Sequence, residues 1–227
     1  HRGRMEIQID IKGISCHGSA PERGDSAAYK AARAALAIEK LNTQLLPDDD
    51  RFLGKGTITV SQIDVHGPSQ CAVPDQAMLY CDRRLTWGET DKSAIAQVQA
   101  VLKEAGVDDF TVYMPEYRKP AWTGTEYHQE LYFPTWKIPE DHILVQSGVE
   151  AYTALFGEKP IVDKWTFSTN AVAICGRHNI PVIGFGPGDE AQAHAPNEIT
   201  RVDDLEIAAA FYVALPFALS ALPTRER

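Results

Sequence analysis

The chain has 227 residues, of which 44% are hydrophobic and 23% charged, and its formal net charge at pH 7 is −9. This length is enough for one large domain or two modest ones, and the composition is typical of a soluble globular protein. The negative charge, without a long basic run, argues against nucleic acid and against anionic membranes as partners.

Neither a membrane span nor a signal peptide is expected. The longest apolar stretch, near residues 208–222, is interrupted by Pro216 and Ser220. The four cysteines show no paired spacing, so reduced thiols in the cytoplasm are the simplest interpretation. The opening HRGRMEIQ is unusual for a natural start, which indicates processing or a piece of a longer chain.

The first 115 residues alternate between the hydrophobic period of a strand and that of a helix. A change of parity between Val60 and Ile63 predicts a bulge. The order strand, helix, strand, strand, helix, strand is that of a ferredoxin-like domain, a four-stranded antiparallel sheet with two helices on one face. Strands are expected over 7–11, 57–65, 77–85 and 110–113. The first helix is expected after a cap at Asp25 or Ser26, with an apolar face from Ala28 to Leu41 and with Lys30, Arg33 and Lys40 on its polar side. The second helix is expected to start at Thr90 or Glu89 and to end at Gly106.

Residues 116–227 have a different character. A proline- and aromatic-rich crossing segment extends to about residue 140, and the rest reads as α/β. This half has too few strands for a covered parallel sheet of its own, which again suggests missing chain. We expect three helices: one over 143–156, a short one from a cap at Ser168 or Thr169 to Gly176, and one that starts near 202 and bends or ends near Pro216. Short strands are expected over 160–164 and 180–186.

The loop GFGPGDEAQAHAPNE, Gly184 to Glu198, is the best candidate for a site. Its glycines allow the backbone to turn sharply and to approach a ligand. His194 lies in this loop after a buried apolar run, and Glu198 follows four residues later. Neutral imidazole is a good zinc ligand and a nearby carboxylate can orient it. From these residues alone, a zinc ligand and a loop histidine without a role are about equally supported.

Three stretches carry a resemblance to a known family. They are GRMEIQIDIKGISCHGSAPERGDSA, CAVPDQAMLYCDRRL and STNAVAICGRHNIPVIGFGPGDEAQAHAPNE. Together they resemble the C-terminal half of the aminoacylase, carboxypeptidase G and succinyl-diaminopimelate desuccinylase family of di-zinc metallohydrolases, in particular the YgeY-type hydrolases. The resemblance covers nearly the whole chain.

The resemblance implies a ferredoxin-like lid that makes a homodimer, here residues 1–115, followed by the C-terminal part of an α/β catalytic domain, here residues 116–227. It also implies two zinc ions in a full-length subunit, with cobalt or manganese as other choices. The family's H-x-D ligand pair is not found in this sequence. We therefore expect this chain alone to hold no metal.

Six residues match positions with a role in the family. His194 matches a zinc ligand, and His17 matches a lid histidine that stabilises the oxyanion in the partner's active site. Arg84, ten positions after Pro74, matches an arginine that binds the substrate carboxylate, although a surface salt bridge explains it nearly as well. Substrate contacts are implied for Thr169, Asn170 and Gly186.

Two departures put substrate contacts in doubt. Cys71 stands where many members have an asparagine, and an acid of the G-T-D-A type is missing near Ser168. The leading hypothesis is part of a metal-dependent hydrolase that cleaves a C–N bond in a peptide, an N-acyl amino acid or a related small amide. The alternatives are a non-catalytic dimerisation or small-molecule binding module, and a stand-alone sensor.

Overall fold

The computed structural model describes residues 1–47, 52–165 and 167–221. The chain divides into two compact units, of which the first holds His1–Trp136 and the second holds Lys137–Trp165 and the chain from Thr169 onward. The sequence placed a boundary after residue 115, whereas residues 116–136 lie in the first unit.

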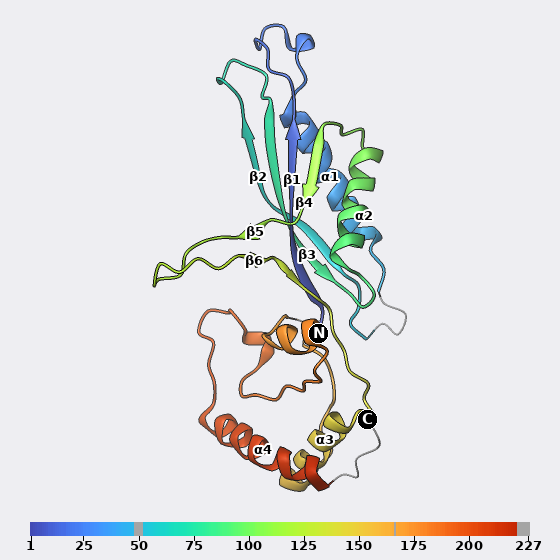
Figure 1. The fold of residues 1–227 in the computed structure, drawn as a ribbon, viewed down its shortest axis with the longest axis vertical. Coiled ribbons are helices and arrows are strands. Elements are labelled where there is room, and N and C mark those ends of the chain that lie inside the picture. Colours follow the sequence, from blue (N-terminus) through green and yellow to red (C-terminus); the bar gives the residue numbers. More distant parts are fainter. Residues whose placement is uncertain (48–51, 166, 222–227) are drawn as a thin grey trace. The chain divides into compact units, whose positions relative to one another are not determined.

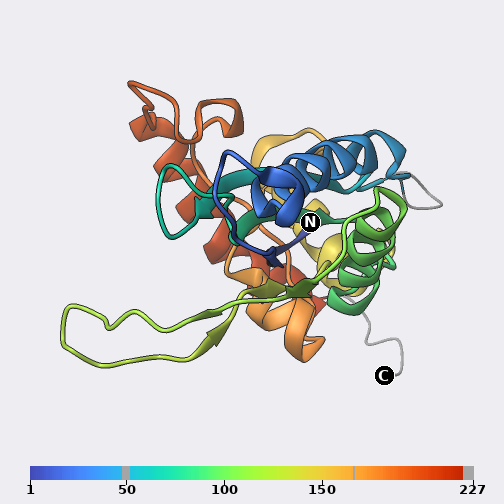
Figure 2. The same ribbon diagram turned by 90° about the horizontal axis from the view of Figure 1, so that it is seen from above.

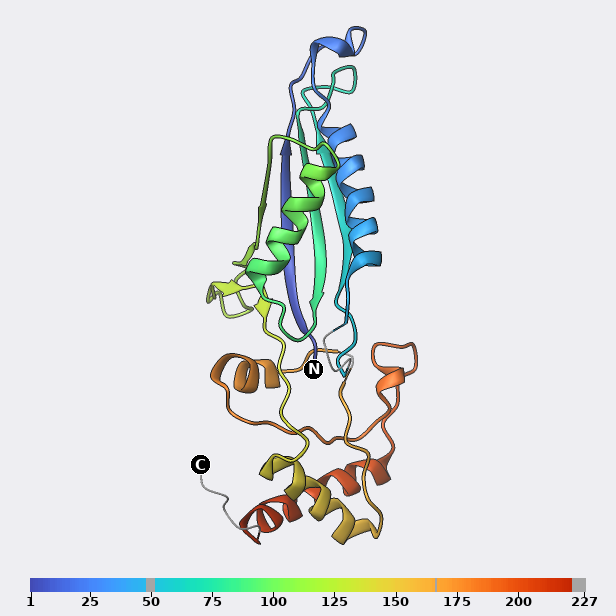
Figure 3. The ribbon, with the colours of Figure 1, turned by 90° about the vertical axis from the view of Figure 1, so that its right-hand side faces the viewer.

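The first unit is built on an antiparallel sheet with the strand order β2-β3-β1-β4. Two helices cover one face of the sheet and leave the other open (Figures 1 and 3). Odd-numbered side chains of β1, such as Ile7 and Ile9, are buried on the helix side, and even-numbered side chains line the open face. The predicted ferredoxin-like order is confirmed. The elements are β1 (Gly3–Lys12), α1 (Ala27–Gln44), β2 (Thr57–His66), β3 (Gln76–Leu85), α2 (Asp91–Glu104) and β4 (Phe110–Tyr113), with a 3₁₀ turn η1 (Pro21–Arg23) before α1.

Local signals in the sequence explain where these elements begin and bend. Ser26 caps α1 by accepting a hydrogen bond from the backbone N–H of Tyr29, and Thr90 caps α2 in a capping box with Ser93. The predicted irregularity in β2 is a register shift between Val60 and Gln62.

Two charged side chains lie in the core of the first unit. Lys30 was expected on the polar side of its helix, and this is wrong, because only 2% of the residue is exposed. Its ammonium group bonds Asp25, Asp108 at 2.6 Å and the carbonyl of Lys12 at 3.0 Å. Arg83 is fully buried and contacts Glu89. Both cations are paired, as buried charges require.

The edge of the sheet beside β1 is interrupted by an inserted hairpin, which we call the arm (residues 116–131). Strand β1 pairs antiparallel with β4, where Gln8 lies opposite Tyr113, and with β7 (Tyr132–Phe133), where Met5 lies opposite Tyr132. From the first pair to the second, β1 moves by 3 residues and the edge strand by 19 residues, so the edge strand has 16 residues in excess. The arm is therefore a 16-residue insertion in an otherwise continuous edge strand.

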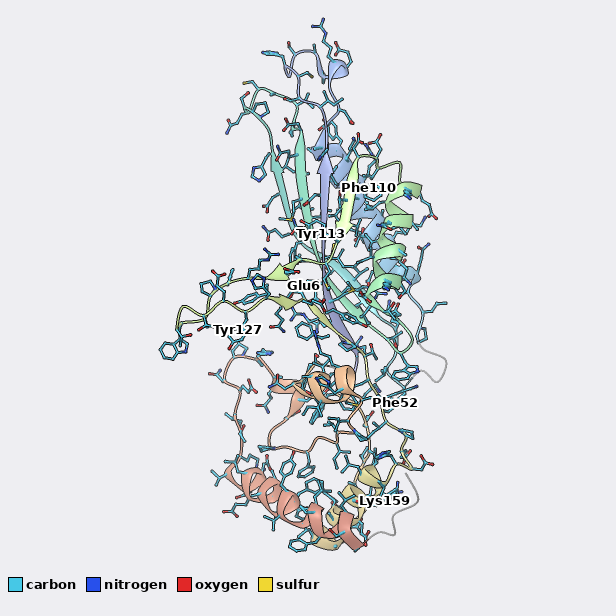
Figure 4. All side chains as sticks on the ribbon, in the orientation of Figure 1. Glu6, Phe52, Phe110, Tyr113, Tyr127 and Lys159 are labelled. Atoms are coloured by element: carbon cyan, nitrogen blue, oxygen red, sulfur yellow. The ribbon has the colours of Figure 1, made fainter. Side chains whose placement is uncertain are left out.

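The arm leaves the layered part of the first unit and carries exposed aromatic side chains. Its strands β5 (Glu116–Tyr117) and β6 (Gln129–Glu130) pair only with each other (Figures 1 and 2). Tyr127 lies on the arm, while Glu6 and Tyr113 lie on the sheet (Figure 4). Trp122, in the turn of the arm, is 98% exposed.

The second unit contains two helices joined by irregular chain. They are α3 (Ile143–Phe156), which ends at Gly157 in the left-handed conformation, and α4 (Val202–Ala221). Between them lie a π-helical turn η2 (Val172–Gly176) and a 3₁₀ turn η3 (Glu190–Gln192).

The strands predicted over 160–164 and 180–186 do not form. A parallel strand needs neighbouring strands for its hydrogen bonds, and the described part of the second unit provides none.

Helix α4 continues through Pro216, where the sequence predicted a bend or an end. Ser220 donates a side-chain hydrogen bond of 2.8 Å to the carbonyl of Pro216. By length and composition α4 is apolar enough for a membrane span, as the core helix of a soluble protein also can be, and one such helix is weak evidence for a membrane. Only 11% of the most apolar 18-residue stretch of α4 is buried.

Candidate functional site

His17 lies in a loop at one end of the sheet, between β1 and α1. The loop is held by backbone hydrogen bonds to the β2–β3 connection, from Val73 N–H to the Cys16 carbonyl (2.8 Å) and from Gly18 N–H to the Cys71 carbonyl (2.7 Å). A side chain at position 18 would come within 2.8 Å of the Cys71 carbonyl, so this close pairing requires glycine.

The base of the same loop is closed by a second set of bonds. Ile14 and Asp25 exchange two backbone hydrogen bonds of 2.8 Å each, and the carboxylate of Asp25 pairs with Lys30. The imidazole of His17 is exposed and contacts Ser19. The loop therefore presents an exposed histidine on a backbone that is tied at both ends.

Arg84 lies on the open face of the sheet and is half-buried. Its guanidinium forms two bonds with the carboxylate of Asp82, of 2.6 Å from Nε and 3.1 Å from Nη2. Its cross-strand neighbour is Arg4, which pairs with Asp82 and Glu6. The bidentate geometry expected for a substrate carboxylate is thus occupied by a carboxylate of the chain itself.

The glycine loop of the second unit is held at Phe185. The hydroxyl of Tyr212 on α4 accepts a hydrogen bond from the Phe185 N–H (3.3 Å) and donates one to the Phe185 carbonyl. The Phe185 ring packs on Phe211, with ring centroids 4.3 Å apart. Tyr212 was not singled out from the sequence, because nothing local links it to a residue 27 positions earlier.

The two glycines beside Phe185 have different reasons to be glycine. A side chain at Gly184 would collide with the ring of Trp165, so packing requires glycine there. At Gly186 no atom of the described residues lies within 4 Å of the position of a side chain, and its φ is not in the left-handed region. Neither packing nor conformation requires glycine at 186, which leaves room for a ligand to approach the backbone.

His194 lies in the irregular chain after η3, with a φ of 62°. Such left-handed backbone is uncommon for residues other than glycine and is enriched at functional sites. The Glu198 carboxylate accepts the backbone N–H of His194 at 3.2 Å, so it orients the backbone and not the ring. Among the described residues the exposed imidazole makes no hydrogen bond, and it is available as a ligand.

Thr169 and Asn170 precede η2. The Thr169 hydroxyl accepts the N–H of Ala171 at 3.2 Å, and the Asn170 carbonyl accepts the N–H of Ala173 at 3.0 Å. The Asn170 side chain is exposed. Thr169 therefore closes a local side-chain turn before η2, and the Asn170 amide is exposed to solvent.

The described residues do not supply a two-zinc centre. Among them, one group of three possible ligand residues could surround an ion, namely Asp25, Asp108 and Asp109, and the ammonium of Lys30 already pairs with these carboxylates. Burial raises the pKa of Cys81 to about 12, so its thiol is not a ready ligand. His194 is then a single ligand where a closed zinc site needs four.

Comparison with known proteins identifies the first unit. Residues 1–109 match the family model of the peptidase dimerisation domain of the M20 type. The uncharacterized protein YgeY of Escherichia coli K12 is 54% identical over 217 residues, which cover 96% of this chain and 53% of YgeY. A probable succinyl-diaminopimelate desuccinylase of Staphylococcus epidermidis is 22% identical, covering 89% of this chain and 52% of that protein.

The fold agrees with these relatives, and the chain spans about half the length of the curated relatives it matches. The crystal structure of aminopeptidase PepT from Bacillus cereus superposes with a TM-score of 0.67 at 19% identity, covering 96% of this chain and 52% of that one. The resemblance noted in the sequence is thus confirmed: residues 1–109 match a peptidase dimerisation domain of the M20 type, the chain is similar in sequence to a probable succinyl-diaminopimelate desuccinylase, and it shares its fold with aminopeptidase PepT.

Proposed function

We propose that this chain is part of a metal-dependent hydrolase that cleaves a C–N bond in a peptide, an N-acyl amino acid or a related small amide, with zinc-activated water. The observation that carries the proposal is His194, an exposed imidazole without a hydrogen-bond partner among the described residues, on left-handed backbone close to the open position at Gly186 in sequence. The names of the relatives, a desuccinylase and an aminopeptidase, support the same class of bond.

In this proposal the chain contributes two histidines and is inactive alone. His194 provides one metal ligand and His17 provides an electrostatic group, whereas a two-metal site needs about five or more ligands. The remaining ligands come from a further segment of the whole protein. The apolar surface of the second unit supports such a segment, since Ile161, Val213 and Phe217 are exposed.

The test compares this chain with a longer form that includes any upstream coding sequence. Plasma mass spectrometry should find close to two zinc ions in each long chain and none in the short one, and only the long form should hydrolyse N-acyl amino acids or dipeptides. In the long form, His194→Ala should lower the zinc content and abolish activity. His178→Ala, which removes another exposed histidine from the second unit, should change neither.

Two results would contradict the proposal. Zinc-dependent amidase activity of the short chain would show that its own residues suffice. A long form without metal would make His194 a bystander and would favour the alternative, a non-catalytic dimerisation or small-molecule binding module.

We also propose that the chain forms a homodimer through its first unit, which the match to a dimerisation domain supports. Strand β2 is an edge strand, with no further strand on its outer side among the described residues. Ile63 and Val65 of β2 face the helix side of the sheet yet remain exposed, and Tyr29 and Leu36 are exposed on the adjacent α1. A second copy is the occupant that a self-complementary surface of this kind fits.

A further inference from the structure

The contact between His17 and Ser19 determines which ring nitrogen of the neutral imidazole carries the hydrogen. The backbone N–H of Ser19 points at Nδ1 of His17, with 3.2 Å between the nitrogens, and the Ser19 hydroxyl oxygen lies 2.7 Å from the same atom. The chain turns tightly here, since the N–H of Ala20 bonds the carbonyl of His17 at 3.0 Å. The turn brings both donors of Ser19 to one ring nitrogen.

A backbone N–H can only donate, so the atom that receives it must carry a lone pair. In a neutral imidazole one nitrogen is an acceptor and the other carries the hydrogen. Because Nδ1 accepts from Ser19, the hydrogen is on Nε2. The hydroxyl of Ser19 can donate to the same lone pair and so adds to this preference.

We infer that Ser19 is a positioning residue, which holds His17 in the tautomer with the hydrogen on Nε2. Among the described residues Nε2 makes no hydrogen bond and the ring is exposed, so its N–H is presented to solvent. This role in hydrolysis rests on the proposed function, in which His17 stabilises a developing negative oxygen. Such an oxygen needs a donor, and the Nε2–H tautomer provides one.

The same tautomer excludes other roles for the neutral ring. Nε2 with a hydrogen has no lone pair for a metal ion or for a proton, and Nδ1 is already engaged by Ser19. His17 therefore differs from His194, whose ring has no such partner among the described residues. The backbone bonds of Cys16 and Gly18 to the β2–β3 connection keep the turn in place.

The tautomer can be measured on this 227-residue chain without any activity. Nitrogen NMR of histidine-labelled protein at about pH 8.5, some two units above the ordinary pKa of histidine, distinguishes the two ring nitrogens. His66 and His178 are internal references, because both are exposed and neither ring makes a hydrogen bond among the described residues. The ratio of Nε2–H to Nδ1–H should be at least about fivefold higher for His17, the effect of an ordinary hydrogen bond.

Variants of Ser19 separate the hydroxyl from the backbone. Ser19→Ala keeps the N–H and removes the hydroxyl, so the ratio should fall toward that of the references, whereas Ser19→Thr should restore it. A His17 ratio equal to that of His66, or a predominant Nδ1–H form, would overturn the inference. Loss of the fold would appear as a collapse of the spectrum, and Ser19→Thr would then still report the contact.

The role in catalysis has its own readout in the longer form. Ser19→Ala should lower kcat severalfold and leave KM within about twofold, because the donor acts on the transition state. A kcat unchanged by Ser19→Ala but reduced by His17→Ala would show that the Ser19 side chain has no positioning role in catalysis. A long form without hydrolase activity would refute the proposed function and leave the tautomer measurement intact, so the two failures are distinguishable.

Discussion

The first unit depends on one residue that joins four distant segments. Lys30 on α1 bonds Asp25 before the helix, Asp108 after α2 and the carbonyl at the end of β1. Burial acts to lower the pKa of its ammonium, but the hydrogen bonds to Asp108 and Asp25 outweigh it and raise the pKa. Lys30 therefore stays charged and gathers the three carboxylates of Asp25, Asp108 and Asp109.

Removing this cation should destabilise the first unit. Lys30→Ala loses a buried side chain and leaves three carboxylates close together, so we expect a loss of about 3 kcal/mol in the free energy of unfolding, measured in urea. Lys40→Ala removes an exposed lysine from the same helix and should cost less than about 0.5 kcal/mol. Equal effects of the two substitutions would show that the pairing of Lys30 does not contribute to the free energy of unfolding.

Acid should reveal the same pairing. The hydrogen bond from Lys30 lowers the pKa of Asp108, so this group stabilises the fold above its ordinary pKa and loses that contribution as the pH falls through the lowered value. For the wild type, the urea concentration at which half the protein is unfolded should therefore decrease as the pH is lowered below about 4. In Lys30→Ala this loss should be absent, because protonation there relieves repulsion among the carboxylates.

At the scale of elements, the arm is separable from the sheet that carries it. Deleting residues 116–131 would place Tyr132 opposite Met5, its present partner, because the register shift equals the 16 residues removed. The arm contributes its own two short strands and one backbone hydrogen bond to the sheet, from the Glu6 N–H to the Leu131 carbonyl (3.0 Å). The midpoint of thermal unfolding should therefore change little, and the free energy of unfolding by less than about 1 kcal/mol.

A deletion one residue shorter is the matched control. Removal of 116–130 would shift β7 by one position and turn Tyr132, which packs against the core, to the open face. This variant should be clearly less stable than the 16-residue deletion. If both deletions unfold the unit equally, the arm itself supports the sheet and the insertion model is wrong.

For the whole molecule, self-association should depend on the surface formed by α1 and β2. The N–H of Ala27 bonds the Pro74 carbonyl and that of Asp75 bonds the His66 carbonyl, so the start of α1 and the end of β2 lie at the same end of the sheet. Light scattering should report a dimer for the wild type. The substitutions Leu36→Glu and Val65→Lys together should raise the dimer dissociation constant at least about tenfold, since charges at a buried core are costly.

The control is an exposed aliphatic residue in the other unit. Ile161 is 92% exposed, and Ile161→Lys should leave the dimer intact. A monomeric wild type would contradict the proposed dimer. A dimer whose dissociation constant is unchanged by Leu36→Glu with Val65→Lys would place the interface elsewhere.

The sequence by itself determined the four long strands and the two helices of the ferredoxin-like part of the first unit, because their signals are local. Alternation of residues 7–11, the caps at Ser26 and Thr90 and the parity change after Val60 each act within a few residues. His17 and His194 were also accessible as candidates, since each lies in a short recognisable motif, and Ser19 was within reach because it follows His17 by two positions.

Only the tertiary structure decided the rest, because the interactions join residues far apart along the chain. Lys30 has the sequence context of an exposed residue and is buried by carboxylates from elsewhere. Phe185 is held by Tyr212, and the 16-residue insertion is visible only in the register of β1. The strands expected over 160–164 and 180–186 failed for the same reason: a strand forms only with partners, and local pattern cannot provide them.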